Sequence, residues 1–350
     1  MMSLREADSF ESAFPSMRHY TGNLETDERG HAQDGRQLPE SHQALSDSAT
    51  RPGQGEQERA FMNQRSGRHI AVLFHARSID LPGSIVYHLA AYWREAGHRV
   101  TFLRGTSRYV PADLLFMHVD LSVVPEEYVE FASRYPVAVN IGATDIRKSC
   151  YTENRVTEED GWTGPVIAKS DLNYGGLPEH LLGPLGVLHR SSFGREMMAF
   201  LASRTSMLTP LPHWNSYPIF DRIDEVPSRL IDDPRVVIER FLPEIENDLY
   251  HVRLYQFLGD RSTCRRIAST EPLVKSGNSA TSETIEPHPL VEQWREGLCL
   301  DYGKLDYVIH EGIPILFDAN KTPGTDNRGR GKVQDDRRRF HAGGIDSLFR

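Results

Sequence analysis

The stretch between residues 68 and 145 carries a strand–helix–strand pattern, which restricts its fold more than any other feature of the chain. Residues 69–76 form a largely apolar run typical of a buried strand, and residues 84–96 follow with the periodicity of an amphipathic helix. After Gly97, which favours a helix end, residues 99–103 form a second strand. This succession predicts a parallel sheet, so we expect an α/β domain here.

The pattern continues and then changes in the second half of the chain. Residues 114–119 and 137–140 are two more apolar strands, separated by a helix over residues 125–135 with proline in its first turn. From Gly164 onward, long glycine-rich loops separate the strands, which predicts an α+β region with an antiparallel sheet. The expected strands there cover residues 165–170, 235–241, 250–258, 265–270, 305–309 and 313–318, and the expected helices cover residues 195–203 and 290–299.

The two ends of the chain carry less structural signal. Residues 1–66 are rich in polar and charged residues and contain only isolated apolar ones, so we expect a disordered or loosely attached extension that buries no core. Residues 331–350 are expected to form a C-terminal tail. The predicted organisation is therefore the extension, an α/β domain over residues 67–145, an α+β region over residues 146–330, and the tail.

The composition argues against several classes of partner. The 350 residues include 40 Lys and Arg against 49 Asp and Glu, and this acidic balance disfavours nucleic acid. The longest apolar runs are strand-sized, far shorter than a membrane span, and the N-terminus lacks the apolar core of a signal peptide. Three widely spaced cysteines disfavour a disulfide framework, so we expect a reducing, cytoplasmic setting.

Two strands near the C-terminus bear candidate metal ligands. Asp306 lies in the apolar run 305–309, and Asp318 and Asn320 stand two residues apart, so the side chains of the last two point to one face. A buried carboxylate is costly unless it is paired or binds a cation, and such oxygen ligands suit Mg²⁺ that bridges nucleotide phosphates. Taken alone, the pattern also fits a hairpin whose acids face solvent.

Two further segments carry residues suited to a nucleotide. Lys169 lies inside an apolar strand that runs into a loop with Asn173, Gly175 and Gly176. Main-chain N–H groups in such a loop can approach phosphate oxygens, although an ordinary strand end and turn would give the same pattern. The strand at residues 236–241 ends in a proline-containing segment whose backbone can meet an adenine edge, or which is simply an edge strand before an acidic turn.

The ordered set of these features resembles one superfamily. A lysine in an apolar strand, a glycine loop, a hinge with a carboxylate, and an Asp followed by Asp-x-Asn resemble the ATP-grasp superfamily, and especially its ATP-dependent carboxylate–amine ligases. The resemblance covers about residues 68–330. It implies that the α/β segment is the domain that precedes ATP-grasp, and that residues 146–330 form two α+β lobes that hold ATP between antiparallel sheets.

The resemblance also implies which residues hold the nucleotide. Lys148 and Lys169 correspond to the two lysines that contact ATP phosphates. Glu239 and Leu242 correspond to the backbone partners of the adenine. The glycine loop, with Asn173, Gly175 and Gly176, corresponds to the segment that closes over the phosphates, and the ribose-binding acid corresponds to Glu246, with Glu244 as a close competitor.

For the metal and the transferring phosphate, this sequence departs from the usual pattern. Asp306, Asp318 and Asn320 match the metal ligands, but Asp318 stands where a glutamate is usual, which shortens that arm by one methylene. Lys304 occupies the place of an arginine that steadies the transferring phosphate, and lysine lacks the planar fork. Arg253 could supply part of that fork, or could be a surface strand arginine.

The implied activity is that of a ligase. It would join a carboxylate to an amine or thiol through an acylphosphate, release ADP and phosphate, and use ATP with Mg²⁺, for which Mn²⁺ is an alternative. Its partners would be small-molecule carboxylate and amine substrates, and a homodimer is compatible with the sequence. Two alternatives stay open: an ATP-grasp kinase that phosphorylates a hydroxyl or a phosphate, and a non-catalytic ATP-binding regulatory protein.

Overall fold

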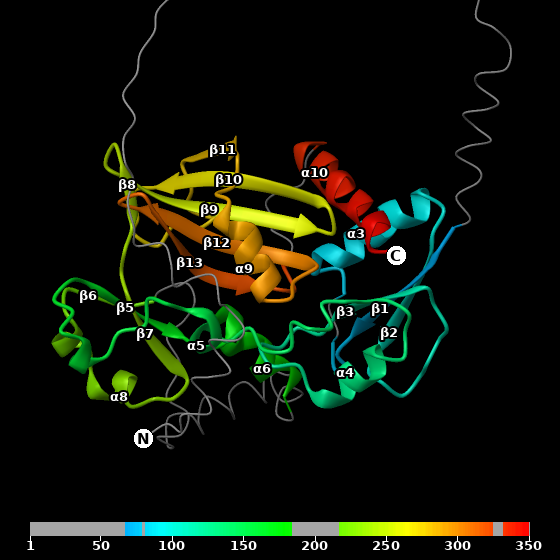
Figure 1. Cartoon of the computed structure of the whole chain (residues 1–350), viewed down its shortest axis with the longest axis horizontal. Helices are drawn as coiled ribbons and strands as arrows, with labels where there is room; N and C mark the ends of the chain where they lie inside the picture. The colour runs from blue at the N-terminus through cyan, green and yellow to red at the C-terminus, as the bar shows by residue number, and fades with distance from the viewer. Residues whose placement is uncertain (1–66, 79–80, 184–216, 325–331, 350) are drawn as a thin grey trace, which may run out of the picture. The chain divides into compact units, whose positions relative to one another are not determined.

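The described residues form three sheets in a computed structural model (Figure 1). The structure describes residues 67–78, 81–183, 217–324 and 332–349. Within these ranges one parallel sheet comes first and two antiparallel sheets follow, so the expected fold class, an α/β domain followed by an α+β region with antiparallel sheets, is confirmed. The helix expected at residues 195–203 lies outside the described residues.

The first sheet is parallel, with its strands in the order β2-β1-β3-β4. Helix α3 packs an apolar face against one side, and helix α4 packs against the other. Because both faces are covered, β1 and β3 are buried at every position, which explains why each is apolar apart from one terminal histidine. The elements are β1 His69–Phe74, α3 Ile85–Glu95, β2 Arg99–Arg104, β3 Leu114–His118, α4 Glu126–Ala132 and β4 Ala138–Val139.

The second sheet has three antiparallel strands in the order β6-β5-β7. Val166 and Ala168 of its central strand pack with Ile238 and Ile223 on one side. Lys169 directly follows Ala168 on this strand, so its side chain projects from the opposite face. The strands are β5 Val166–Ser170, β6 Ile219–Phe220 and β7 Val236–Arg240, and the neighbouring helical segments are α5 Lys148–Tyr151, η3 Asn173–Gly176, α6 Leu177–Leu182 and α8 Ser228–Ile231.

The third sheet runs β11-β10-β9-β12-β13, with β8 also paired to β9. One face of this sheet carries large aromatic side chains and is covered by helix α9. Tyr255, Phe257 and Tyr307 are fully buried, and Trp294 of helix α9 meets the Tyr307 ring edge-on at 5.9 Å between ring centres. The strands are β8 Glu244–Glu246, β9 Leu249–Leu258, β10 Arg261–Ser269, β11 Thr281–Ile285, β12 Tyr302–His310 and β13 Ile313–Asn320, and α9 covers Leu290–Gly297.

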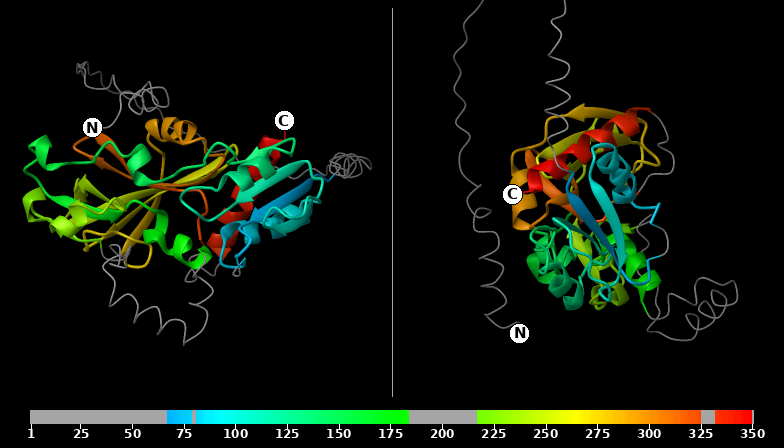
Figure 2. Two further views of the ribbon diagram at one scale, coloured as in Figure 1. Left: turned by 90° about the horizontal axis from the view of Figure 1, so that it is seen from below. Right: turned by 90° about the vertical axis from the view of Figure 1, so that its right-hand side faces the viewer.

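A helix occupies the segment expected to be a C-terminal tail. Helix α10, Lys332–Ala342, lies beside α3 (Figure 2), and η7, Gly343–Leu348, follows it. The Trp93 indole N–H of α3 donates to the carbonyl of Ala342 at 2.9 Å. Sequence reasoning missed α10 because its sequence, KVQDDRRRFHA, is too highly charged to show an apolar stripe.

The remaining differences from the predicted elements lie at the short helices α5, α6 and α8 and at short or exposed strands. Strands β6 and β8 have two and three residues, and β11 is exposed along most of its length, so none carries the apolar signal of a core strand.

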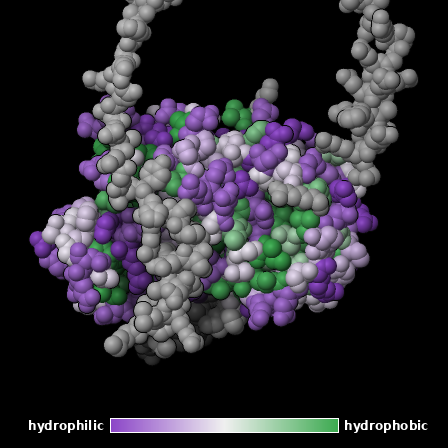
Figure 3. Space-filling model, viewed as in Figure 1, coloured by the Kyte–Doolittle hydropathy of each residue, from purple (hydrophilic) through white to green (hydrophobic). Residues whose placement is uncertain are grey.

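Figure 3 shows one face of the molecule, on which hydrophilic side chains surround smaller hydrophobic areas. Among the described residues, no helix is long and apolar enough to cross a membrane.

Two buried histidines should make the fold sensitive to acid. Burial lowers the pKa of His118 to about 3 and of His341 to about 4. Their pKa in the unfolded chain is about 6.5, so below that pH the unfolded state binds protons that the folded state does not. Each histidine should therefore cost about 2 kcal/mol of stability between pH 6.5 and pH 5.

Urea unfolding at pH 7 and pH 5 checks this expectation. His341→Gln keeps a hydrogen-bonding group for Thr263, whose hydroxyl lies 3.0 Å from His341 Nε2. We expect this variant to lose about 2 kcal/mol less than the unaltered chain over the same pH interval. An identical pH dependence in both proteins would show that His341 titrates normally in the folded state.

Candidate functional site

Asp306 and Asp318 stand directly opposite each other on β12 and β13. Lys304 and Asn320 form the opposed pair two residues away, so all four side chains project from one face. The register shifts just beyond Asp306, which leaves Phe317 as an extra residue on β13. Such a bulge bends a strand and re-aims its side chains. The two strands thus pair as the sequence predicted and bring both acids to one place.

Asp306 has one paired oxygen and one that is unsatisfied. Lys304 Nζ donates to Asp306 Oδ2 at 2.8 Å. Oδ1 is buried and has no hydrogen-bond partner among the described residues. Burial raises the pKa of Asp306, Lys304 opposes the rise, and Asp318 adds to it. A buried carboxylate oxygen without a donor is a favourable ligand for a cation.

Asp318 and Asn320 complete a set of oxygen donors that fits Mg²⁺. Lys148 Nζ lies 3.0 Å from Asp318 Oδ1, and the Asn320 side-chain oxygen accepts the Thr322 N–H at 2.8 Å. Both side chains keep further lone pairs. No three His, Cys, Asp or Glu side chains of the described part cluster as metal ligands, so the donors here are two carboxylates and an amide. Mg²⁺ commonly takes one or two carboxylates and completes its shell with water and phosphate oxygens.

Lys169 connects the second sheet with the third. Its ammonium donates to Glu239 Oε2 on β7 at 2.5 Å and to the Phe317 carbonyl on β13 at 3.4 Å, and it lies 4.8 Å from the centre of the Phe317 ring. Lys169 is 6% exposed and Glu239 is 1% exposed. The resemblance implied only a backbone role for Glu239, whereas its side chain is the buried counter-ion of Lys169.

Lys148 approaches the same edge of β13 from helix α5. It is buried, pairs with Asp318, and donates to the Leu172 carbonyl at 3.3 Å. Burial alone would lower the pKa of Lys148, but the negative charge of Asp318 outweighs it and the pKa is raised. The lysine therefore remains charged. Lys148 and Lys169 come from different elements and converge on one strand, as two lysines that share an anion would.

Two tyrosines in this cluster escaped sequence reasoning. The Tyr151 hydroxyl oxygen accepts the Ala319 N–H at 3.0 Å. Burial, reinforced by Asp318 and Glu239, raises the pKa of Tyr151, and burial also raises the pKa of Tyr217 to about 12. Both tyrosines therefore stay protonated. The only sequence signal for Tyr151 was its position three residues after Lys148, which places both on one side of a helical turn.

The glycine loop adopts a strained backbone. Tyr174, Gly175 and Gly176 have φ angles of 50°, 68° and 77°, in the left-handed region that a tyrosine rarely occupies. Asn173 is buried, and its N–H donates to the Ser122 hydroxyl at 2.8 Å. Leu172, whose carbonyl binds Lys148, directly precedes this loop. The loop therefore begins beside the lysine–acid cluster, which consists of the pairs Lys148–Asp318, Lys169–Glu239 and Lys304–Asp306.

Two acids follow β7, and the structure separates their roles. Glu244 is buried and accepts hydrogen bonds from Arg253 at 3.0 and 2.9 Å, from Arg266 at 2.8 Å and from the Ile309 N–H at 2.7 Å. Glu246 is exposed and pairs with Arg266 at 2.6 Å. Of the two candidates for a ribose-binding acid, Glu246 is the one that a ligand can reach.

The same contacts fix Arg253. Both ends of its guanidinium fork bind Glu244, and its side chain is 21% exposed. Glu244 lies between Arg253 and Arg266, which stand directly opposite each other on β9 and β10 and would otherwise repel. The fork considered for the transferring phosphate is therefore engaged with a buried carboxylate, and Lys304 is the cation nearest to Asp306 in the structure's ion pairs.

An apolar surface adjoins the acids. Leu242 and Phe317 pack with a buried cluster on one face of the third sheet, and Leu254 of this cluster stands opposite Asp306 on the neighbouring strand. Residues that stand opposite one another share a face, so the apolar cluster and the acids lie side by side. A flat aromatic base beside charged phosphates would match this surface. The cluster consists of Val252, Leu254, Ile267, Val308 and Ile315.

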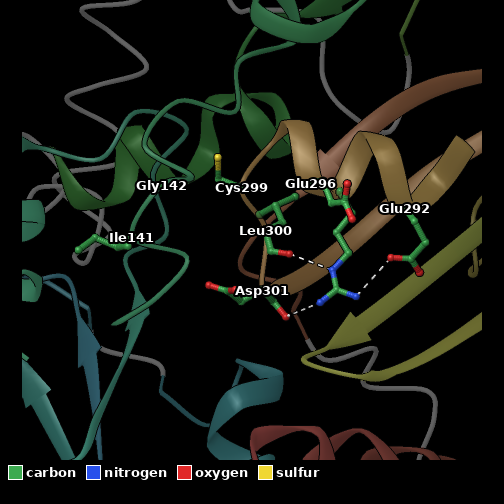
Figure 4. Close-up of a pocket in the computed structure, with 8 residues that line it drawn as sticks. Ile141, Gly142, Glu292, Glu296, Cys299, Leu300 and Asp301 are labelled. Carbon is green, nitrogen blue, oxygen red and sulfur yellow. Dashed lines mark hydrogen bonds and ion pairs between the residues drawn. The ribbon is translucent and has the colours of Figure 1, made fainter. Parts of the chain in front are cut away.

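A pocket of about 580 Å³ lies elsewhere (Figure 4). It is formed by the end of α9, the Cys299–Asp301 turn and the loop at Gly142, and its cation, Arg295, is held by Glu292 at 3.6 Å and by the Leu300 carbonyl at 3.0 Å. None of the lysines and acids described above lines it. We therefore take the lysine–acid cluster, and not this pocket, as the candidate functional site.

Three solved structures are similar to this chain over most of its length. A D-alanine–D-alanine ligase from Bacillus anthracis is 12% identical with a TM-score of 0.43, and the match covers 81% of this chain and 96% of the ligase. An ATP-grasp RimK domain protein from Sphaerobacter thermophilus is 13% identical with a TM-score of 0.44, covering 79% and 99%. D-cycloserine synthetase DcsG is 11% identical with a TM-score of 0.40, covering 81% and 100%.

No protein-family model matches the chain, and a search of curated proteins finds no match. At this level of identity and with these TM-scores, the likeness does not extend to function. What the chain does has to be inferred from its own residues.

The buried Lys169–Glu239 pair gives the first test of the site. Lys169→Ala would leave the Glu239 carboxylate buried without a counter-ion, so we expect the free energy of unfolding to fall by about 3–5 kcal/mol. Adding Glu239→Gln removes the buried charge and should recover most of that loss. Urea unfolding at pH 7 measures both.

A matched control uses an exposed pair. Arg222 and Asp224 are 3.0 Å apart with side chains 56% and 62% exposed, so Arg222→Ala should cost no more than about 1 kcal/mol. A cost for Lys169→Ala as small as that of the control would mean that Glu239 carries no charge in the folded state.

Proposed function

We propose that this chain is an ATP- and Mg²⁺-dependent ligase that joins a carboxylate to an amine or thiol through an acylphosphate and releases ADP and phosphate. The observation that carries the proposal is the convergence of two buried lysines from separate elements on Asp318 and on the bulged residue Phe317, beside an unsatisfied oxygen of Asp306. Such an arrangement suits an anion that arrives with its own divalent cation, as ATP does.

Each side chain of the cluster has a task in this proposal. Asp306, Asp318 and Asn320 hold Mg²⁺, which when bound neutralises charge on the ATP phosphates. Lys148 and Lys169 contact phosphate oxygens and stabilise the charge that grows on them as the substrate carboxylate attacks the γ-phosphorus. The bond from the γ-phosphorus to the bridging oxygen breaks, ADP leaves, and the acylphosphate remains. The amine or thiol then attacks the acyl carbon and phosphate leaves. The glycine loop keeps water away from the acylphosphate.

The nucleoside would lie against the apolar cluster. Leu242 and the backbone of Glu239 would meet the adenine, and Glu246 would accept hydrogen bonds from the ribose hydroxyls. Glu244 is excluded from that role because four donors already bind it. The cytoplasm, where cysteines stay reduced and ATP is plentiful, fits this function.

One observation favours a non-catalytic ATP-binding protein as a second candidate. The transferring phosphate would meet Lys304 in place of an arginine, and Lys304 is itself paired with Asp306 at 2.8 Å. Asp318 is also shorter than the usual glutamate. If these two positions fail to support phosphoryl transfer, the site would bind ATP without consuming it.

The ligase activity predicts a specific dependence on substrates. ADP should accumulate beyond a single turnover only when ATP and Mg²⁺ are supplied together with both a carboxylate and an amine or thiol, because the second nucleophile must consume the bound acylphosphate before the next turnover. A coupled assay for ADP over a panel of acid and amine pairs measures this. ADP formation with hydroxyl compounds alone would indicate a kinase, and ATP binding without ADP formation across the panel would indicate the non-catalytic alternative.

Asp318→Asn separates binding from turnover. The amide keeps the size of the side chain but removes the charge that helps to hold Mg²⁺, so we expect turnover to fall by at least about 100-fold, while ATP affinity changes by less than about tenfold. Isothermal titration and the ADP assay give the two values. Equal losses in both would show that Asp318 acts through nucleotide binding alone.

A further inference from the structure

Ser122, in the loop after β3, holds the glycine loop by two hydrogen bonds. Its hydroxyl oxygen accepts the Asn173 N–H at 2.8 Å, and its own N–H donates to Glu179 Oε1 at 2.7 Å. Ser122 is 0% exposed, and Asn173 is 5% exposed. These bonds connect the α/β domain to both ends of the strained segment that contains Gly175 and Gly176.

The same residue also holds the chain that leads to Lys148. The Ser122 carbonyl accepts the Ile146 N–H at 2.9 Å, and Val124 N–H donates to the Thr144 carbonyl at 2.7 Å. Residues 122–124 and 144–146 thus form a short antiparallel ladder that ends just before α5. One serine therefore contacts both segments that carry phosphate-binding candidates, the α5 side with Lys148 and the glycine loop.

The glycine loop has a second anchor that does not involve the α/β domain. Asp171 accepts the Ser149 N–H at 2.7 Å and the Ser149 hydroxyl at 2.8 Å. This anchor holds the chain just before the loop, where Leu172 binds Lys148. Ser122 contacts the two ends of residues 173–179, at Asn173 and at Glu179. Each anchor therefore uses a serine hydroxyl: the Ser149 hydroxyl binds Asp171 before the loop, and the Ser122 hydroxyl binds Asn173 within it.

We propose that Ser122 is a positioning residue that keeps the glycine loop folded over the phosphates of ATP, a role that rests on the proposed function. The positive φ of Tyr174 is costly for a residue with a side chain, and the Asn173 N–H is buried, so it needs its acceptor. Without the Ser122 hydroxyl this N–H has no partner inside the fold. The loop then lowers its energy by opening toward water, and the backbone N–H groups leave the phosphate site.

The test compares two variants that each lose one hydroxyl. Ser122→Ala should speed hydrogen–deuterium exchange in peptides that contain Asn173 by about tenfold and weaken ATP binding by about tenfold, since a hydrogen bond to a buried donor is lost. Ser149→Ala, which keeps the backbone bond to Asp171, should leave exchange at Asn173 unchanged. Thermal unfolding of both variants shows that they are folded.

A second pair of variants tests the other bond. Glu179→Gln retains an oxygen that can accept the Ser122 N–H, whereas Glu179→Ala does not. The glutamine variant should keep the slow exchange and the ATP affinity that the alanine variant loses. Equal exchange rates at Asn173 in the two variants would show that the bond from the Ser122 N–H to Glu179 does not hold the loop, and that result would overturn the proposal.

The failures of the two ideas can be told apart. If the unaltered chain binds no ATP, the proposed function and this role are both overturned. If it binds ATP and Ser122→Ala binds it equally well, or if exchange at Asn173 is unchanged in Ser122→Ala, only the positioning role is overturned.

Discussion

The balance of buried charge between the second and third sheets underlies the rest of the site. Three lysines and three acids form separate pairs there: Lys169 with Glu239, Lys148 with Asp318, and Lys304 with Asp306. Each charge is costly to bury alone, so each partner fixes the place of the other. Because Lys169 also contacts Phe317, the pairs hold β5, β7 and β13 in a common arrangement. In the proposed function, an incoming anion would meet lysines whose positions these pairs already fix.

The sequence alone predicted the parts of this arrangement that follow from local pattern. Alternation and unbroken apolar runs revealed β1, β3, β5, β12 and β13, and the two-residue spacing of Asp318 and Asn320 placed them on one face. These features depend on neighbours along the chain. They are visible because the side chains of a strand alternate between two faces, and because a strand covered on both faces is apolar along most of its length.

What the sequence could not reveal depends on partners that are distant in the chain. Glu239 and Glu244 look alike in sequence, yet one neutralises Lys169, 70 residues away, and the other joins Arg253, Arg266 and the Ile309 backbone. Tyr217 has no local signal at all. A side chain's burial and counter-ion are set by which strands pair, and this is decided by the whole fold rather than by any one segment.

The bond from Trp93 to the Ala342 carbonyl joins residues 249 positions apart. Ala342 and Ile345 belong to the same core cluster as Ile70, Val72 and Trp93, so the α/β sheet receives part of its cover from the last turns of the chain. During synthesis, these early strands leave the ribosome long before α10 exists. Their apolar face must therefore wait, partly uncovered, until Ala342 and Ile345 have been synthesised.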